Sequence, residues 1–249
     1  MAPLISFHNA SKRYPDGGRE ILVLDRASLD IEQGVSVGVY GSKRSGKSTL
    51  LRMAAGIILP DTGVVSFAGR DMAQMSGGER SRLLRSAIAF MSAQDWRAHP
   101  GETVVDHVAT SLGSEGLTMR EAKRRALRIL DRVGVGAAGA QEATASLSLT
   151  DRPRVMLARA LAREPRLLVL DEPALMPSLG DRDRFYALLR EAAYERGMAL
   201  LMGSEEMSAL QGVTVLMSIS DGELCSTEGQ GTVVRLPGRR RATAEHNRQ

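Results

Sequence analysis

The sequence predicts an α/β fold built on a mainly parallel sheet. Short apolar runs typical of buried strands alternate with helical segments along most of the 249 residues. One run, residues 35–40, ends at a glycine-rich turn that opens a helix, and another, residues 167–170, ends at two carboxylates. Between residues 103 and 146 the pattern is helical alone. Strands separated by helices favour parallel pairing, and the all-helical stretch predicts a helical insertion.

The expected elements follow one another in a regular order. Residues 119–133 form the most amphipathic segment, with Ala122, Ala126, Leu127, Ile129 and Leu130 expected on one side. Further helices are expected at residues 46–55, 151–162 and 181–194. Strands are expected at residues 4–8, 22–29, 35–40, 63–67, 167–170, 198–202 and 213–219, with a short one after Gly222.

Composition excludes several classes of protein. Cys225 is the single cysteine, so an internal disulfide is excluded. No apolar run approaches the roughly 18 to 20 residues of a membrane helix, and the N-terminus lacks a signal-peptide pattern. We therefore expect a soluble, cytosolic protein. The formal charge of +4 owes part of its excess to residues 239–241, in a basic C-terminal tail at 231–249 that we expect to be disordered and solvated. Contact of this tail with nucleic acid or anionic lipid is the alternative.

The turn after residues 35–40 has the spacing of a phosphate-binding loop. Residues 41–48 fit the pattern G-x-x-x-x-G-K-[ST]. Backbone N–H groups of such a loop point at phosphates, and the positive end of the following helix reinforces them. The lysine reaches the β- and γ-phosphates, and the last hydroxyl ligates Mg²⁺. The nucleotide-binding residues expected here are Gly41, Ser42, Lys43, Arg44, Ser45, Gly46, Lys47, Ser48 and Thr49.

Two carboxylates complete this prediction. Asp171, at the end of the apolar run, is expected to hold Mg²⁺ or its water together with Ser48. Glu172 is the expected catalytic residue, which orients or polarises the attacking water. An apolar strand that ends in aspartate is common by itself, but its pairing with the loop makes the pattern specific. The sequence therefore predicts binding of ATP with Mg²⁺.

The order of these features resembles an ABC ATPase. Residues 154–161, reading Arg-Val-Met-Leu-Ala-Arg-Ala-Leu, precede Pro165 and the strand that ends at Asp171, as in the family's segment between its signature and its acidic strand. The resemblance covers residues 3 to about 228. It implies an ABC-type P-loop ATPase domain at 3–230, with a helical subdomain at about 95–150 and an antiparallel β-subdomain. Residues 71–90 further resemble the branch for lipoprotein release, macrolide efflux and cell division.

The resemblance also implies roles for single residues. Tyr14 would stack on adenine, the alternative being a core tyrosine. Gln94 lies near the position where a glutamine contacts Mg²⁺ and the permease, although Ala93 is the alternative at that position. Trp96 would face either the permease or the local core. Ser148 would contact the γ-phosphate of the ATP bound to the opposite subunit.

Several positions depart from the family pattern, among them Arg44, which replaces a usual glycine inside the phosphate loop. In register with the signature Leu-Ser-Gly-Gly-Gln the chain has Leu-Ser-Leu-Thr-Asp, so Leu149 and Thr150 place side chains where backbone should approach phosphate. Ser204 stands in place of the switch histidine, and a hydroxyl cannot carry an imidazole's charge. The segment 174–180 does not read Ser-Ala-Leu-Asp. The four histidines, at positions 8, 99, 107 and 246, are expected to be surface or core residues.

The expected function follows from the retained nucleotide-binding residues and from the departures in the signature and the switch. The resemblance implies an ATP-binding subunit on the inner face of the cell membrane, in a homodimer or a heterodimer with another ABC ATPase, coupled to a separate permease that makes the membrane contact. Because two contacts to the transition state are lost, we expect slow hydrolysis. A non-transport ATP-sensing regulator or scaffold is the alternative. A DNA-associated ABC ATPase is disfavoured because residues 103–146 are too few for a long coiled coil, so we expect no nucleic-acid partner.

Overall fold

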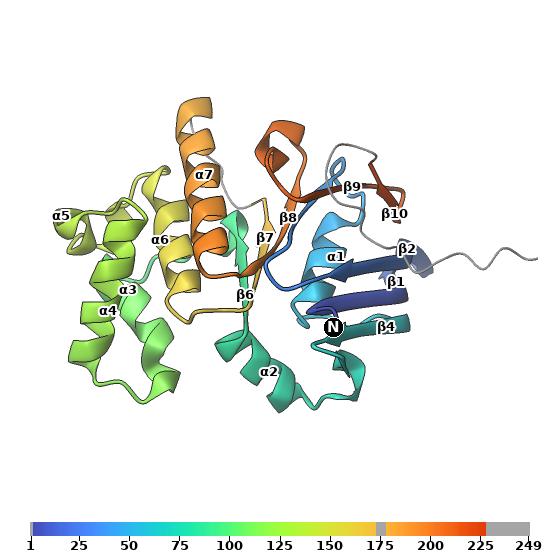
Figure 1. Ribbon diagram of the computed structural model, residues 1–249, viewed down its shortest axis with the longest axis horizontal. Helices are drawn as coiled ribbons and strands as arrows, with labels where there is room; N and C mark the ends of the chain where they lie inside the picture. Colours follow the sequence, from blue (N-terminus) through green and yellow to red (C-terminus); the bar gives the residue numbers. More distant parts are fainter. Residues whose placement is uncertain (1, 173–177, 228–249) are drawn as a thin grey trace, which may run out of the picture.

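The computed structural model describes residues 2–172 and 178–227 and arranges them around two sheets (Figure 1). The larger sheet has the strand order β10-β9-β3-β8-β7-β6, and every neighbouring pair in it is parallel except β9 and β10. This confirms the predicted α/β fold with a mainly parallel sheet. Its strands are β3 (Ser36–Tyr40), β6 (Ile88–Ser92), β7 (Leu167–Asp171), β8 (Ala199–Ser204), β9 (Val215–Ser220) and β10 (Glu223–Ser226).

The smaller sheet is antiparallel and has the order β2-β1-β4-β5. Its strands are β1 (Ile5–Asp16), β2 (Arg19–Ile31), β4 (Thr62–Phe67) and β5 (Arg70–Asp71). The β1–β2 hairpin runs well beyond the predicted strands and pairs as far as Asp16 and Arg19. The sequence pattern missed this outer half because its residues are mostly exposed and show no apolar alternation.

The helices cover both faces of the large sheet. They are α1 (Lys47–Ala54), α2 (Gly77–Ser86), α3 (Val104–Ala109), α4 (Met119–Arg132), α5 (Ala137–Ala140), α6 (Asp151–Leu161) and α7 (Leu179–Glu195). Short 3₁₀ turns lie at η1 (Met72–Gln74), η2 (Ala93–Asp95), η3 (Thr110–Glu115), η4 (Thr144–Ser146) and η5 (Met207–Leu210). Between residues 103 and 146 the structure is helical, as predicted, with one isolated bridge between Thr103 and Ala143. Among the described residues no helix has both the length and the apolar character needed to cross a bilayer.

Two features of the helices differ from the sequence expectation. Leu127 was expected on the buried side of α4, but it is 37% exposed, because at 100° per residue it is turned away from Ala122 and Ala126. Helix α2 was not predicted, since it buries none of its residues and so has no apolar stripe. Its start is set by a capping box between Ser76 and Glu79, within the Ser-Gly-Gly-Glu string that mimics a signature.

The core divides between the two faces of the large sheet. Alternate strand residues point to opposite faces, so Leu168 and Leu170 of β7 join one cluster while Leu167 and Val169 join the other. The first cluster contains the helical part and Phe185 of α7. The second contains α1 and the small sheet, which lie on the opposite side in Figure 1. The large sheet is therefore buried on both faces, and its strand ends remain the accessible edge.

Candidate functional site

The predicted nucleotide residues meet at the carboxyl-terminal edge of the parallel strands. The register pairs Tyr40 with Ser204, Gly203 with Asp171, and Asp171 with Ser92. Four strands therefore end side by side, and the loop that begins at residue 41 leaves from β3, in the middle of the six-stranded sheet. Ligands of open α/β sheets bind at this edge.

The phosphate-binding loop has the backbone geometry that its glycine requires. Gly46 has φ 106°, and a Cβ on it would lie 2.5 Å from the carbonyl oxygen of Val23. A side chain at this position would therefore be both strained and in collision. The Lys47 ammonium is buried and donates to the carbonyl oxygens of Gly41, over 2.7 Å, and Ser42, over 2.9 Å. The loop is thus closed around its own lysine.

Ser45 supplies a test of whether the loop fits an anion. Its hydroxyl is buried and lines the nucleotide cavity, yet it has no hydrogen-bond partner in the described part of the chain. A buried hydroxyl without a partner is costly in a folded protein. A phosphate oxygen in the cavity is an acceptor of the kind that this donor lacks, so the loop fits the group that the sequence predicts.

Three oxygen-bearing side chains fit Mg²⁺. The Ser48 hydroxyl donates to Asp171 Oδ1 over 3.0 Å, and Gln94 lines the same cavity. Hydroxyl, carboxylate and amide oxygens suit a hard divalent cation. Ala93 is not among the residues that line the cavity, so the structure favours Gln94 of the two positions considered.

Glu172 is held against the end of β8. Its carboxylate accepts hydrogen bonds from the Glu205 backbone N–H, over 2.6 Å, and from the Ser204 hydroxyl, over 3.2 Å. Burial raises the pKa of Glu172, and these hydrogen bonds oppose that rise. Its backbone has φ 45°, an uncommon value for a residue with a side chain. A half-buried carboxyl with a raised pKa, beside a phosphate loop, is suited to accept a proton.

The cavity that these residues enclose measures about 490 Å³. Ile21 and Val23 of β2 form an apolar side that the sequence did not suggest, because the pairing of the hairpin is needed to bring them to the loop. Tyr14 is the partner of Ile21 across the hairpin but does not line the cavity, and its contact with adenine stays a prediction. The cavity is lined by Ile21, Val23, Lys43, Arg44, Ser45, Gly46, Lys47, Ser48, Thr49, Arg52, Ser92, Gln94, Asp171, Glu172 and Glu205.

Ser148 lies apart from this cavity. It is exposed at the start of α6, where its hydroxyl donates to the Asp151 carboxylate over 2.7 Å and accepts from the Asp151 backbone N–H over 3.1 Å. Leu149 beside it is 58% exposed. The contact expected between Ser148 and the ATP of the opposite subunit stays a prediction. The irregular segment 174–180 lies partly, and the basic tail lies wholly, outside the described residues.

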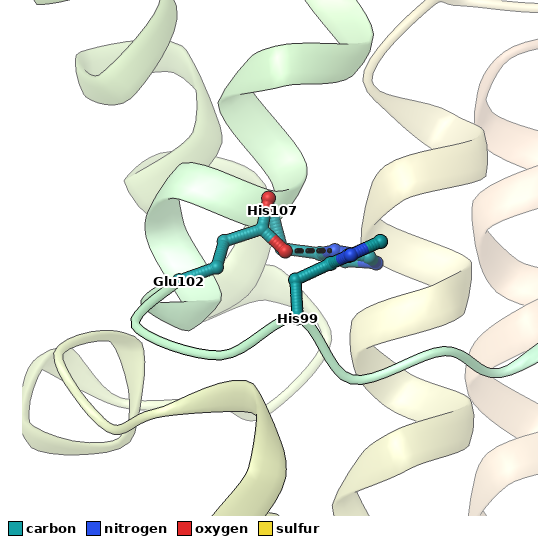
Figure 2. A group of neighbouring side chains, drawn as sticks. All are labelled: His99, Glu102 and His107. Atoms are coloured by element: carbon teal, nitrogen blue, oxygen red, sulfur yellow. Dashed lines mark hydrogen bonds and ion pairs between the residues drawn. The ribbon is translucent and has the colours of Figure 1, made fainter.

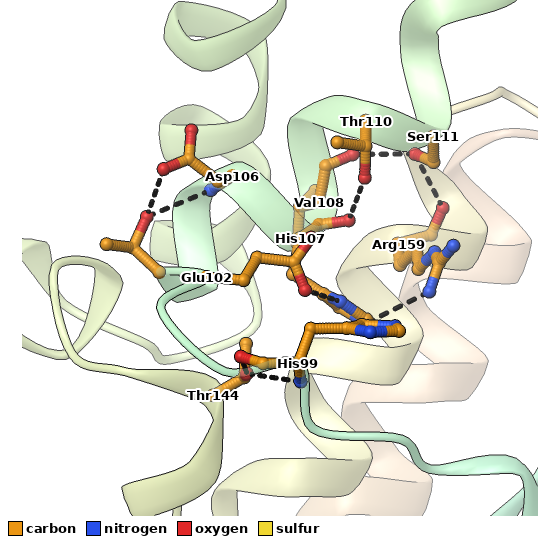
Figure 3. A network of polar contacts seen from close by, with 10 residues as sticks. His99, Glu102, Asp106, His107, Val108, Thr110, Ser111, Thr144 and Arg159 are labelled. Carbon is orange, nitrogen blue, oxygen red and sulfur yellow. Dashed lines mark hydrogen bonds and ion pairs between the residues drawn. The ribbon is translucent and has the colours of Figure 1, made fainter.

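A second polar cluster lies in the helical part of the chain. Figure 2 shows His99, Glu102 and His107 close together, with donor atoms within 4.8 Å of one another, a composition that suits a metal ion. Figure 3 shows that the buried His107 ring is already engaged at both nitrogens. Nδ1 lies 2.9 Å from Glu102 Oε2, and Nε2 lies 3.0 Å from Arg159 Nη1.

These contacts determine the protonation of His107. Because a guanidinium only donates, Nε2 must accept the hydrogen bond from Arg159. The ring proton is therefore on Nδ1, which donates a hydrogen bond to the Glu102 carboxylate. Burial lowers the pKa of His107, which keeps the ring neutral. A cation at Nδ1 would move the proton to Nε2, where it would face the Arg159 donors. The cluster is therefore a hydrogen-bonded triad of Glu102, His107 and Arg159, in agreement with the structural role expected for the histidines.

Solved structures share this fold. A dimeric ATP-binding cassette in a post-hydrolysis state, bound to ADP and phosphate, superposes with a TM-score of 0.82 at 23% identity, covering 91% of this chain and 100% of the other. A second dimeric structure, of a bacterial ABC transporter cassette, gives a TM-score of 0.83 at 24% identity with the same coverage. Both likenesses confirm the cassette architecture of the chain.

Sequence relatives identify the family. The family model described as ABC transporter matches residues 24–175. The chain is 31% identical to the lipoprotein-releasing ATP-binding protein LolD of Pseudomonas syringae pv. tomato, over 89% of this chain and 96% of the relative. It is also 31% identical to the methionine import ATP-binding protein MetN of Streptomyces coelicolor, over 97% of this chain and 70% of the relative. The chain therefore belongs to the ABC transporter family, as one of its ATP-binding subunits.

Proposed function

We propose that this subunit binds ATP with Mg²⁺ in the cavity at the sheet edge and couples that binding to a membrane permease on the cytoplasmic face. The observation that carries the proposal is the hydrogen bond between Ser48 and Asp171, which sets two predicted metal ligands beside the buried Lys47. The relatives that release lipoproteins, together with the pattern of residues 71–90, support a place in that branch.

Each residue of the cavity has a task in this mechanism. Lys47 exchanges the carbonyl oxygens of Gly41 and Ser42 for phosphate oxygens, while the loop N–H groups and the Ser45 hydroxyl donate to the same phosphates. Ser48, Asp171 and Gln94 would hold Mg²⁺, which would offset phosphate charge. Glu172 then orients the attacking water and accepts its proton.

Turnover in this site is proposed to be slow. Ser204 reaches the Glu172 carboxylate, but its neutral hydroxyl has neither the charge nor the reach of an imidazole. In the loop that would face the opposite subunit, Leu149 and Thr150 replace the glycines of the family. Each lost contact of this kind costs about 10²–10³ in rate. ATP binding is retained because the cradle itself is complete.

The resembling solved cassettes are dimers, and the proposed dimer needs a second chain to complete each site. Ser148 and Leu149 are exposed in the turn that precedes α6, where a partner has access to them. A homodimer would carry both substitutions in both sites. A heterodimer with a complete ABC ATPase would have one site without a switch histidine and one without an intact signature.

The proposed permease contact is a second cavity of about 470 Å³. Trp96 lines this cavity and comes two residues after Gln94 in the sequence. A segment bound in the cavity would therefore lie close to a proposed metal ligand. Trp96 also packs against the core, and its ring centroid lies 5.3 Å from that of His107, so its core contact is observed and its contact with the permease is part of this proposal. Among the described residues that line the cavity, one is acidic, Asp95, and four are arginines: Arg85, Arg97, Arg159 and Arg163. The charge of the cavity therefore favours an acidic docking segment.

Thermal unfolding with and without ATP-Mg tests the nucleotide site. Saturating ligand is expected to stabilise the wild type by about 2–4 kcal/mol, and Lys47→Ala is expected to remove the shift. An equal shift in both proteins would contradict the site.

Co-purification with a multi-span membrane protein encoded by a neighbouring gene tests the permease contact. Arg85→Glu is expected to weaken it, whereas Arg82→Glu, on the same helix but outside the cavity, is the matched control. Equal retention of the membrane protein by both variants would contradict docking in this cavity.

The second candidate is an ATP-sensing regulator or scaffold, favoured by the loss of the switch histidine at Ser204. Phosphate release measured with and without the membrane partner separates the two. Stimulation by the partner supports a transporter subunit, whereas ATP binding that recruits the partner with no turnover supports the regulator.

A further inference from the structure

We propose that Glu205 is a specificity-determining residue of the nucleotide site, whose carboxylate opposes the third phosphate and so favours ADP over ATP relative to a neutral side chain. The inference rests on the proposed function, because it concerns the same cavity. The Glu205 carboxylate is a negative charge in this cavity that comes from outside the phosphate loop, residues 41–48.

The position of Glu205 is well defined by its backbone. It follows directly after β8, and its N–H donates to Glu172 Oε1 over 2.6 Å. The preceding Ser204 is 2% exposed and bonds the same carboxylate. Residue 205 is therefore tied to the end of the strand, and its carboxylate changes place only by rotation of its own side chain.

The side chain of Glu205 is directed at the lysine of the loop. Its Oε1 lies 3.9 Å from Lys47 Nζ, and the residue lines the nucleotide cavity. Within the described ranges it is the acidic residue that forms an ion pair with Lys47. The side chain is 48% exposed, whereas Lys47 is 5% exposed, so the carboxylate faces the buried ammonium from the open side of the cavity.

This placement puts a negative charge near the terminal phosphate. A phosphate-loop lysine contacts the β- and γ-phosphates, so a group 4 Å from the ammonium lies within several ångströms of the γ-phosphate oxygens. ADP lacks the third phosphate, and its β-phosphate would be held by the N–H groups of the loop. Repulsion between unit charges falls with distance and is strong only at short range, so it acts mainly on ATP.

The other acidic residues of the cavity do not act in the same way. Asp171 accepts from Ser48 and belongs to the proposed metal site, where Mg²⁺ offsets its charge. Glu172 is fixed by two hydrogen bonds at the end of β8. Of the three, Glu205 is the residue whose carboxylate forms an ion pair with Lys47, and it is linked to Glu172 only through its backbone N–H.

Glu206 provides a control for charge alone. It is the next residue in the chain, but it does not line the cavity and its carboxylate pairs with Arg182. Glu205→Gln and Glu206→Gln therefore remove the same charge from adjacent positions, and only the first is expected to alter the surroundings of the third phosphate.

Titration calorimetry of the full chain with ADP-Mg and with a non-hydrolysable ATP analogue and Mg²⁺ tests the proposal. Glu205→Gln is expected to tighten binding of the analogue about tenfold and that of ADP less than threefold, with the difference shrinking in high salt. Glu206→Gln is expected to change neither dissociation constant.

Two outcomes would overturn the role of Glu205 while leaving the nucleotide site intact. Equal changes for both nucleotides, or none, would show that the carboxylate does not sense the third phosphate. Weaker binding of the analogue by Glu205→Gln would make Glu205 a metal ligand instead. Failure of the wild type to bind either nucleotide would overturn the proposed function itself, and this inference with it.

Discussion

The Ser48 hydroxyl donates a hydrogen bond to Asp171 Oδ1 over 3.0 Å and so joins two segments that are 123 residues apart. The bond exists because β3 and β7 lie in one sheet with β8 between them, which brings the loop and the acidic strand end to the same edge. It places both oxygens where one cation can bind them, in a cavity that also contains Gln94.

Removal of this hydroxyl should weaken magnesium-dependent binding. Ser48→Ala takes away one proposed metal ligand and leaves the loop backbone in place, so the stabilisation by ATP-Mg should fall by about 1–2 kcal/mol. Thermal shift in Mg²⁺ and in EDTA measures it, and the exposed Ser226→Ala on β10 is the control. If Ser48→Ala keeps the full magnesium-dependent shift, the hydroxyl is not a ligand.

The raised pKa of Glu172 predicts a pH-dependent penalty on folding. Because burial raises the folded-state pKa above 4.5, the folded chain holds this proton longer than the unfolded chain. Stability is therefore lost as pH rises from 4.5 through the folded pKa, and above that value the penalty is complete. Glu172→Gln should raise the free energy of unfolding at pH 7, and this gain should vanish below pH 4.5.

Urea unfolding at a series of pH values measures this effect, with the exposed Glu223→Gln as the control. A stability gain for Glu172→Gln that stays constant down to pH 4 would contradict the role of burial. The same variant should bind ATP and lose turnover, because an amide cannot accept the proton of water. Any turnover of the wild type should decline on the acid side at a pH above 4.5.

Restoring the missing contacts should accelerate hydrolysis. Ser204→His returns an imidazole beside Glu172 and should raise the rate of phosphate release about tenfold or more, with little change in ATP affinity. Because Ser204 is buried, a melting curve must accompany the assay. The double change Leu149→Gly and Thr150→Gly lies at the exposed turn before α6 and provides an independent test. If neither change raises turnover, these substitutions are not the cause of slow hydrolysis.

The triad of Glu102, His107 and Arg159 should act through stability. His107→Ala removes a buried ring and leaves the partly buried Glu102 carboxylate without its donor, which should cost about 1–3 kcal/mol in urea unfolding. His99→Ala is the matched control, since its ring is exposed and the bonds to Thr144 use its backbone. Zn²⁺ should leave the melting temperature unchanged, whereas a rise that His107→Ala abolishes would identify a metal site.

The sequence by itself determined the local chemistry of the site. The spacing of residues 41–48 and the apolar run that ends at Asp171 predicted a phosphate loop and an acidic strand end, because glycine conformation and strand burial are local properties. The amphipathic pattern of residues 119–133 likewise predicted α4. Elements without a buried stripe, such as α2, left no such pattern.

Only the tertiary structure decided which distant residues face one another. Ile21 reaches the loop through the hairpin register, Glu205 faces Lys47 through the parallel pairing of β8 with β3, and His107 meets Arg159 through the packing of α3 on α6. These contacts span long stretches of chain and depend on strand order and helix packing, which periodicity within a segment does not encode. The sequence thus identified a nucleotide cradle, and the fold decided which charges surround the nucleotide.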